Sequence, residues 1–110
     1  MALQTVRGTR DILPKENRKF RFITDTARNL AERYGYGQIS TPIIEPTEVF
    51  QRTLGEVSDV VSKEMYTFFD RNGLSLTLRP EGTAGIVRAI VSESLDQQLP
   101  LRYFYEGAMF

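Results

Sequence analysis

The chain has 110 residues, of which 41% are hydrophobic, and it carries 14 basic and 14 acidic side chains. This length fits one domain with a packed core, and the composition excludes a disordered or low-complexity chain. The sequence contains neither cysteine nor histidine, which excludes thiol nucleophiles, imidazole bases, disulfides and the usual zinc sites. No apolar run approaches the ~20 residues that span a bilayer, and residues 1–10 lack the apolar stretch of a secretory signal. We therefore expect a cytoplasmic protein without membrane contacts.

The net charge of zero hides an uneven distribution of charge along the chain. Residues 1–33 hold eight basic and four acidic side chains, so this part carries +4 and the remainder −4. A basic face of this kind can bind nucleic acid. A solvated helix face has the same composition, so charge alone leaves both interpretations open.

The first part of the chain predicts one long helix. Residues that are apolar at helical spacing follow a polar lead-in, which predicts a helix from about residue 14 to residue 34 that Gly35 and Gly37 end. The apolar stripe of this helix consists of Phe20, Ile23, Ala27, Leu30, Ala31 and Tyr34. Phe22 lies off the stripe, so it is either incidental or marks a second buried face at a subunit contact.

An interrupted strand and a short helix come next. Residues 36–44 resemble a strand, but Pro42 lacks the N–H of a sheet ladder, which places the segment at an edge or ends its pairing there. Pro46 and Thr47 open a short helix that runs through Leu54 and ends at Gly55. Residues 56–64 fit either a helix or a loop.

The clearest local signal is a hairpin. Strand-like residues 65–69 and 74–78 flank a polar turn at 70–73 with the sequence Asp-Arg-Asn-Gly. Leu74, Leu76 and Leu78 alternate with polar residues, so the second strand has one apolar and one polar face.

The remaining residues predict a second helix and the final strands. The turn at 80–83 leads into a helix that stops before Pro100 and whose apolar side consists of Ile86, Val87, Ile90, Val91 and Leu95. Residues 101–105 predict a strand, and residues 107–110 begin another that has no partner left in the sequence. This order of elements indicates an α+β fold with a mostly antiparallel sheet flanked by helices.

The sharpest candidate site is Glu81-Gly82-Thr83, where the polar strand face meets a helix N-terminus. Glu81 offers a carboxylate to a cationic ligand such as an ammonium group, Gly82 allows a ligand close to the backbone, and Thr83 offers a hydroxyl. The structural alternative is that Thr83 caps the helix and Glu81 complements its dipole.

Other candidate residues carry weaker signals. Arg79 can clamp a carboxylate or phosphate, or pair with Glu81 or another acid. Arg7 and Arg10 flank a glycine but lack the spacing of a known phosphate-binding loop. A solvated surface is favoured over a Mg²⁺ site for the acids Glu56, Asp59 and Glu64. Core packing is favoured over base stacking for the aromatic residues of the predicted strands, which are Tyr66, Phe68, Phe69, Tyr103, Phe104 and Tyr105.

Taken together, these segments resemble histidyl-tRNA synthetases over nearly the whole chain. The most specific stretch is 76–85, which places the Glu-Gly-Thr loop in a Leu-Arg-Pro context. The other matching segments are 7–14, 34–36, 41–45, 55–57, 63–68 and 87–89.

The resemblance implies the N-terminal portion of a class II synthetase catalytic domain, whose dimer-forming motif 1 corresponds to residues 15–46. Phe22 and Pro42 would then lie at a dimer interface, in a homodimer. Residues 79–85 would form the histidine-binding loop, with Glu81 and Thr83 holding the substrate ammonium group and Gly82 allowing close approach. Residues 101–110 would begin motif 2, whose phosphate-binding arginine follows the phenylalanine that Phe110 matches.

The family's reaction joins histidine to ATP as histidyl-adenylate and then transfers it to histidine tRNA, with ATP as co-substrate and Mg²⁺ expected. We place no catalytic residue and no metal ligand within these 110 residues, and we expect them to be inactive alone. Two alternatives are a non-catalytic relative, such as the regulatory subunit of ATP phosphoribosyltransferase, and a dimerisation or interaction module.

Overall fold

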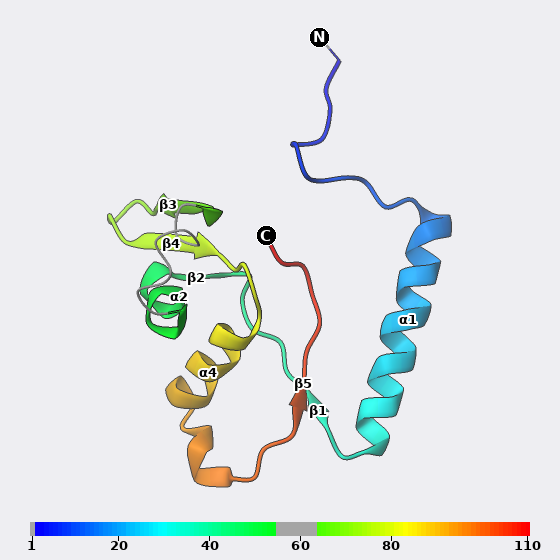
Figure 1. The fold of residues 1–110 in the computed structure, drawn as a ribbon, viewed down its shortest axis with the longest axis vertical. Coiled ribbons are helices and arrows are strands. Elements are labelled where there is room, and N and C mark those ends of the chain that lie inside the picture. The colour runs from blue at the N-terminus through cyan, green and yellow to red at the C-terminus, as the bar shows by residue number, and fades with distance from the viewer. Residues whose placement is uncertain (1, 55–63) are drawn as a thin grey trace. The chain divides into compact units, whose positions relative to one another are not determined.

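The computed structural model describes residues 2–54 and 64–110, which form two compact units, Met1–Tyr36 and Gly37–Phe110 (Figure 1). The side chains of residues 53 and 54 are also outside the description. The end of the short helix at Gly55, the ambiguous segment up to residue 63, and the acids Glu56 and Asp59 therefore lie outside the described residues.

The first unit contains one helix, α1, at Pro14–Arg33, which confirms the predicted long helix. Pro14 occupies the first helical position, where its missing N–H costs no hydrogen bond. At the other end, the N–H groups of Tyr34 and Gly35 donate to the carbonyls of Ala31 and Glu32, and Gly35 has a φ of +82°. The predicted stop at Gly35 therefore rests on the left-handed conformation that glycine tolerates.

No residue of α1 is buried. Phe22 and Ile23 are both exposed, so neither the apolar stripe nor the off-stripe aromatic is covered. Near the N-terminus of α1, Nη1 of Arg10 donates to Oε2 of Glu16 at 2.8 Å, and the Arg10 guanidinium lies 6.0 Å from the ring centre of Phe20. The hydrogen bond to Arg10 lowers the pKa of Glu16, and the same bond raises the pKa of Arg10.

The second unit is built on a three-stranded antiparallel sheet of β2 (Ile44–Pro46), β4 (Ser75–Leu78) and β3 (Thr67–Phe69), in that order. β3 and β4 form the predicted hairpin. Oδ1 of Asp70 accepts the N–H groups of Asn72 and Leu74 at 2.8 and 2.9 Å, and Gly73 has a φ of +83°. The turn is thus fixed by local side-chain chemistry, which is why the sequence predicts it well.

A second, two-stranded sheet pairs β1 (Gly37–Gln38) with β5 (Tyr103–Phe104) in parallel. The predicted strand at 36–44 is therefore split into β1 and β2, and Pro42 lies in the gap between them, as expected of a residue that ends pairing. The predicted strand at 101–105 is confirmed as β5, which pairs with β1 from a distant part of the sequence. The prediction of a further, unpartnered strand at the end of the sequence is wrong. Residues 107–110 form no strand.

The described residues of this unit also form α2 (Thr47–Leu54), α4 (Thr83–Ser92) and a 3₁₀ turn, η1 (Leu95–Gln98). α2 lies against β2, β4 and α4 (Figure 1). The core consists of Phe50, Met65 and Ala84, with Val49 packed against it.

The predicted apolar side of α4 is wrong in part. The residues that α4 buries are Ala84, Gly85, Ile86 and Ala89, whereas Val87 and Val91 are exposed. The reason is a close approach: a Cβ added at Gly85 would lie 3.1 Å from Oγ1 of Thr41 and 3.6 Å from Oε2 of Glu45. Only small side chains fit where α4 meets this part of the chain.

The polar face of β4 is the more buried one. Thr77 is fully buried, whereas Leu74 beside β4 is exposed. The Thr77 hydroxyl donates to Oγ1 of Thr47 at 2.8 Å and lies 3.0 Å from Oγ1 of Thr67, and Thr47 lies 2.7 Å from the Ser75 hydroxyl. These bonds satisfy the buried hydroxyls. The prediction that the hairpin aromatics belong to the core is wrong for Tyr66, Phe68 and Phe69, which are all exposed.

Candidate functional site

The carboxylate of Glu81 caps the N-terminus of α4. Its Oε2 accepts the N–H of Thr83 at 2.6 Å, and its Oε1 accepts the N–H of Ala84 at 3.0 Å. Gly82 occupies the N-cap position and Thr83 is the first helical residue, so the alternative in which Thr83 caps the helix is wrong. A carboxylate offers about four lone-pair sites, and Glu81 is only partly buried. The Glu81 carboxylate therefore keeps lone pairs that can accept hydrogen bonds from a ligand.

The hydroxyl of Thr83 faces a residue that lies 22 positions further along the chain. Thr83 is exposed, and its Oγ1 lies 2.8 Å from Oη of Tyr105, with either oxygen able to donate. Tyr105 follows β5 directly. Sequence reasoning placed Tyr105 in the core and missed it as part of this site, because no local pattern connects residues so far apart in the chain.

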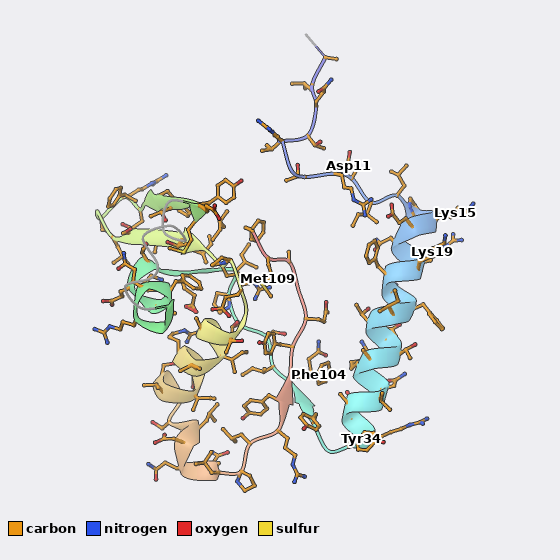
Figure 2. The ribbon with its side chains drawn as sticks, viewed as in Figure 1. Asp11, Lys15, Lys19, Tyr34, Phe104 and Met109 are labelled. Carbon is orange, nitrogen blue, oxygen red and sulfur yellow. The ribbon has the colours of Figure 1, made fainter. Side chains whose placement is uncertain are left out.

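The space next to Gly82 is filled by the protein itself. A Cβ added at Gly82 would overlap the ring of Tyr105 and would lie 3.1 Å from Cε of Met109. Figure 2 shows Met109 on the final segment, beside the connection between β4 and α4. The sequence predicted that Gly82 makes room for a ligand, but in this structure the room is taken by Tyr105.

Arg79 makes structural contacts. It is buried, its Nε donates to the carbonyl of Ala108 at 2.9 Å, and its Nη1 donates to the carbonyl of Thr41 at 3.3 Å. Its main chain adds two more bonds, because its N–H donates to Ile43 and its carbonyl accepts the N–H of Phe110. Of the alternatives left open for Arg79, the structure shows a structural contact in place of an ion pair with Glu81, since Arg79 joins three segments of main chain.

An ion pair that the sequence analysis missed connects β2 to α4. Nε of Arg88 donates to Oε2 of Glu45 at 2.8 Å, and the Glu45 side chain is almost fully buried. Nη1 of Arg88 also donates to the Ser92 hydroxyl at 3.0 Å. The alternation of polar and apolar residues gives no signal for this pair, since its members lie 43 residues apart.

The remaining predicted residues are described within their own units. Phe22 is exposed on α1 and Pro42 is exposed in the second unit. Arg10 is paired with Glu16. Among residues 2–54 and 64–110, no three acidic side chains lie close enough to hold a metal ion, and in the same ranges no helix has the length and apolar character to cross a bilayer.

One hollow in the second unit is lined by Ala84, near the end of the loop at 79–85. It has a volume of about 320 Å³ between α2 and α4, and its wall includes Val49, Val87 and Val91. Neither Glu81 nor Thr83 lines it. The wall of the hollow also includes the charged and polar residues Glu48, Arg52, Arg88 and Ser92.

Comparison with known proteins identifies the family. A family model described as histidyl-tRNA synthetase matches residues 8–110. The histidine–tRNA ligase of Rhodospirillum rubrum is 62% identical over 109 residues, and that of Gluconobacter oxydans is 56% identical over 108 residues. These alignments cover 99% and 98% of this chain but only 26% of each relative, so the chain spans about a quarter of their length.

Solved structures have the same fold. The apo histidyl-tRNA synthetase of S. aureus superposes with a TM-score of 0.81 at 38% identity, over 99% of this chain and 26% of that one. A Bacillus halodurans structure described as an ATP phosphoribosyltransferase regulatory subunit/histidyl-tRNA synthetase superposes with a TM-score of 0.82 at 30% identity, over 100% and 28%. The α+β class predicted from the sequence is confirmed, and the chain belongs to the histidyl-tRNA synthetase family.

Proposed function

We propose that this chain is the N-terminal part of the catalytic domain of a histidine–tRNA ligase, with residues 79–85 as its histidine-binding loop. The complete protein would activate histidine with ATP and pass the histidyl group to histidine tRNA. The relatives named as ligases favour this activity over a regulatory subunit or an interaction module.

The observation that carries the proposal is the geometry of Glu81 and Thr83. Both lie at the start of α4, one as a partly exposed carboxylate and the other as an exposed hydroxyl, two residues apart. An amino acid's ammonium group has three N–H donors and a positive charge. It therefore matches an acceptor set of one carboxylate and one hydroxyl, with a charge-assisted bond to Glu81 as the strongest contact.

The chemistry of the reaction suits a chain without histidine or cysteine. The substrate carboxylate attacks the α-phosphorus of ATP, pyrophosphate leaves, and the acyl group then moves to the tRNA. Positioning of the reactants and neutralisation of phosphate charge supply most of the acceleration in such a step. Glu81 and Thr83 would contribute positioning, because they would fix the ammonium end of the amino acid.

ATP and Mg²⁺ are the expected co-substrate and ion of the complete protein. The described residues offer no cluster of three metal ligands. We therefore assign none of them a part in holding Mg²⁺ and derive no step that depends on it.

The exposed helix α1 supports a second part of the proposal, a homodimer contact within residues 15–46. No residue of α1 is buried, and Phe22 is 72% exposed. An amphipathic helix that leaves its aromatic residues in water gains free energy when a second copy covers them. Sedimentation of the complete protein should show a dimer that Phe22→Ser weakens.

The test of the binding role uses Glu81→Gln in the complete protein, with histidine and ATP affinities measured by calorimetry. Loss of a charge-assisted bond of about 1.5–3 kcal/mol predicts a histidine Kd that rises about 10- to 150-fold, while the ATP Kd stays within about twofold. Glu93→Gln is the matched control, since Glu93 is exposed at the other end of α4.

A ligand-side control separates recognition from folding, because Glu81 also caps α4. Imidazole propionate keeps the ring and carboxylate of histidine but lacks the ammonium group. It should bind the wild-type protein and Glu81→Gln equally weakly. If Glu81→Gln weakens histidine, ATP and imidazole propionate alike, the substitution acts on the fold and the proposed role is wrong.

A further inference from the structure

Tyr105 reaches the start of α4 from a distant part of the chain. The chain after β5 runs back from the β1–β5 pair to the connection between β4 and α4 (Figure 1), and the Phe110 N–H donates to the Arg79 carbonyl at 2.9 Å. Along this segment, the hydroxyl of Tyr105 lies 2.8 Å from Oγ1 of Thr83. The aromatic ring therefore lies over Gly82, while its polar end contacts the proposed ligand-binding hydroxyl.

Packing fixes the position of the Tyr105 ring. The ring occupies the space that a side chain at Gly82 would need, and the side chain of Met109 borders the same space. On the other side, Tyr105 follows β5 directly, and the pairing of Phe104 with Gln38 anchors its main chain. The phenol oxygen is consequently held at a defined place next to Thr83, at little further cost in side-chain entropy.

A threonine hydroxyl needs such a neighbour to bind a cation well. Its single proton rotates about the Cβ–Oγ1 bond, and its two lone pairs accept hydrogen bonds only when that proton points elsewhere. If the proton points at an ammonium group, the hydroxyl repels the cation. Either oxygen of this 2.8 Å pair can donate. An ammonium group next to Thr83 favours the arrangement in which Thr83 donates its proton to the Tyr105 oxygen, because the Thr83 lone pairs then face the positive charge.

We propose that Tyr105 is a positioning residue that turns the Thr83 hydroxyl into an acceptor for the ammonium group of the amino-acid substrate. The proposal rests on the proposed function of this loop. It gives the phenol hydroxyl a role that core packing alone does not require, since phenylalanine would fill the same space over Gly82.

The test compares Tyr105→Phe, Thr83→Val and the double variant in the complete protein. Tyr105→Phe keeps the ring and removes only the hydroxyl, and Thr83→Val keeps the shape and removes the acceptor. We expect Tyr105→Phe to raise the histidine Kd about 3- to 10-fold, the range for one neutral hydrogen bond. The KM for histidine in pyrophosphate exchange should rise by the same factor, and the KM for ATP should not change.

The double variant gives the decisive readout. If Tyr105 acts through Thr83, Tyr105→Phe in the Thr83→Val background causes no further loss of histidine affinity. Imidazole propionate, which lacks the ammonium group, should bind all three variants as it binds the wild type. Tyr103→Phe on β5 is the matched control and should leave both affinities unchanged.

Three results would overturn the proposal: no change in histidine affinity for Tyr105→Phe, equal losses for histidine and ATP, or additive losses in the double variant. Each is distinguishable from failure of the proposed function. If Glu81→Gln weakens histidine binding and Tyr105→Phe does not, the loop binds the amino acid and only the role of Tyr105 is wrong. If Glu81→Gln has no effect on histidine, the function itself fails.

Discussion

Glu45 on β2 and Arg88 on α4 form an ion pair 2.8 Å long, and the Glu45 side chain is only 5% exposed. The pair lies next to Gly85, because a Cβ added there would lie 3.6 Å from Oε2 of Glu45. It therefore connects the middle of α4, the helix that begins at Thr83, to the antiparallel sheet. A buried charge of this kind is tolerated because its partner and further hydrogen bonds replace water.

Removal of one member of this pair should destabilise the protein. Glu45→Gln leaves Arg88 without its counter-charge in a largely buried place, and we expect a loss of about 2–4 kcal/mol in the free energy of unfolding. Urea denaturation measures it. The matched control is Glu48→Gln, which breaks an exposed pair with Arg52 at 3.9 Å and should change stability by less than about 0.5 kcal/mol. Equal effects of the two substitutions would contradict the assigned role of burial.

Gly82→Ala should destabilise the protein through packing. The φ of Gly82 is −95°, which alanine adopts freely, so the backbone is not strained by the change. The new methyl group instead overlaps the Tyr105 ring, and overpacking of this kind costs about 1–3 kcal/mol. Thermal unfolding measures the loss. Tyr105→Ala in the same chain should relieve part of it, and Gly37→Ala, where a Cβ meets nothing within 4 Å, serves as the control.

Arg79→Met should loosen the final segment of the chain. The substitution keeps much of the side-chain volume but leaves the carbonyls of Ala108 and Thr41 without their donor. Both bonds are part-buried, and the loss of each costs about 0.5–1.5 kcal/mol. Hydrogen exchange at the Phe110 amide, which donates to the Arg79 carbonyl, should accelerate. Arg71→Met, in the exposed hairpin turn, should leave that amide unchanged.

The ion pair at the start of α1 should respond to acid. The bond to Arg10 holds the pKa of Glu16 below its ordinary value of 4.5, so the pair contributes stability at pH above that value. This contribution is lost as the pH falls through the lowered pKa of the folded state. Arg10→Ala should raise the Glu16 pKa in an NMR titration, and salt should do the same because both groups are exposed. Arg7→Ala should leave the Glu16 pKa unchanged.

The sequence predicts those elements whose causes are local. The turn at Asp70 and the stop of α1 at Gly35 both rest on chemistry within a few residues, and both are confirmed. The start of α4 at Thr83 follows from the polar turn before it. The α+β class is the sum of such local signals.

The sequence does not predict contacts between distant segments. The side of α4 that is buried depends on how closely Thr41 approaches Gly85, and no periodicity in α4 reports that distance. The contact between Thr83 and Tyr105 is not predicted for the same reason, since 22 positions separate the two residues. Burial of Thr77 on the polar face of β4 likewise depends on the hydroxyl of Thr47, which supplies the bond that makes a polar interior stable.

The parallel pairing of β1 with β5 also has a consequence for folding during synthesis on the ribosome. Gly37 pairs with Tyr103, so about 65 residues must be synthesised between the two partners. At the usual pace of translation, about 5–20 residues per second, β1 waits about 3–13 s for its partner. Throughout that interval its edge is open to other nascent chains, and ribosome pausing on the intervening codons prolongs the exposure.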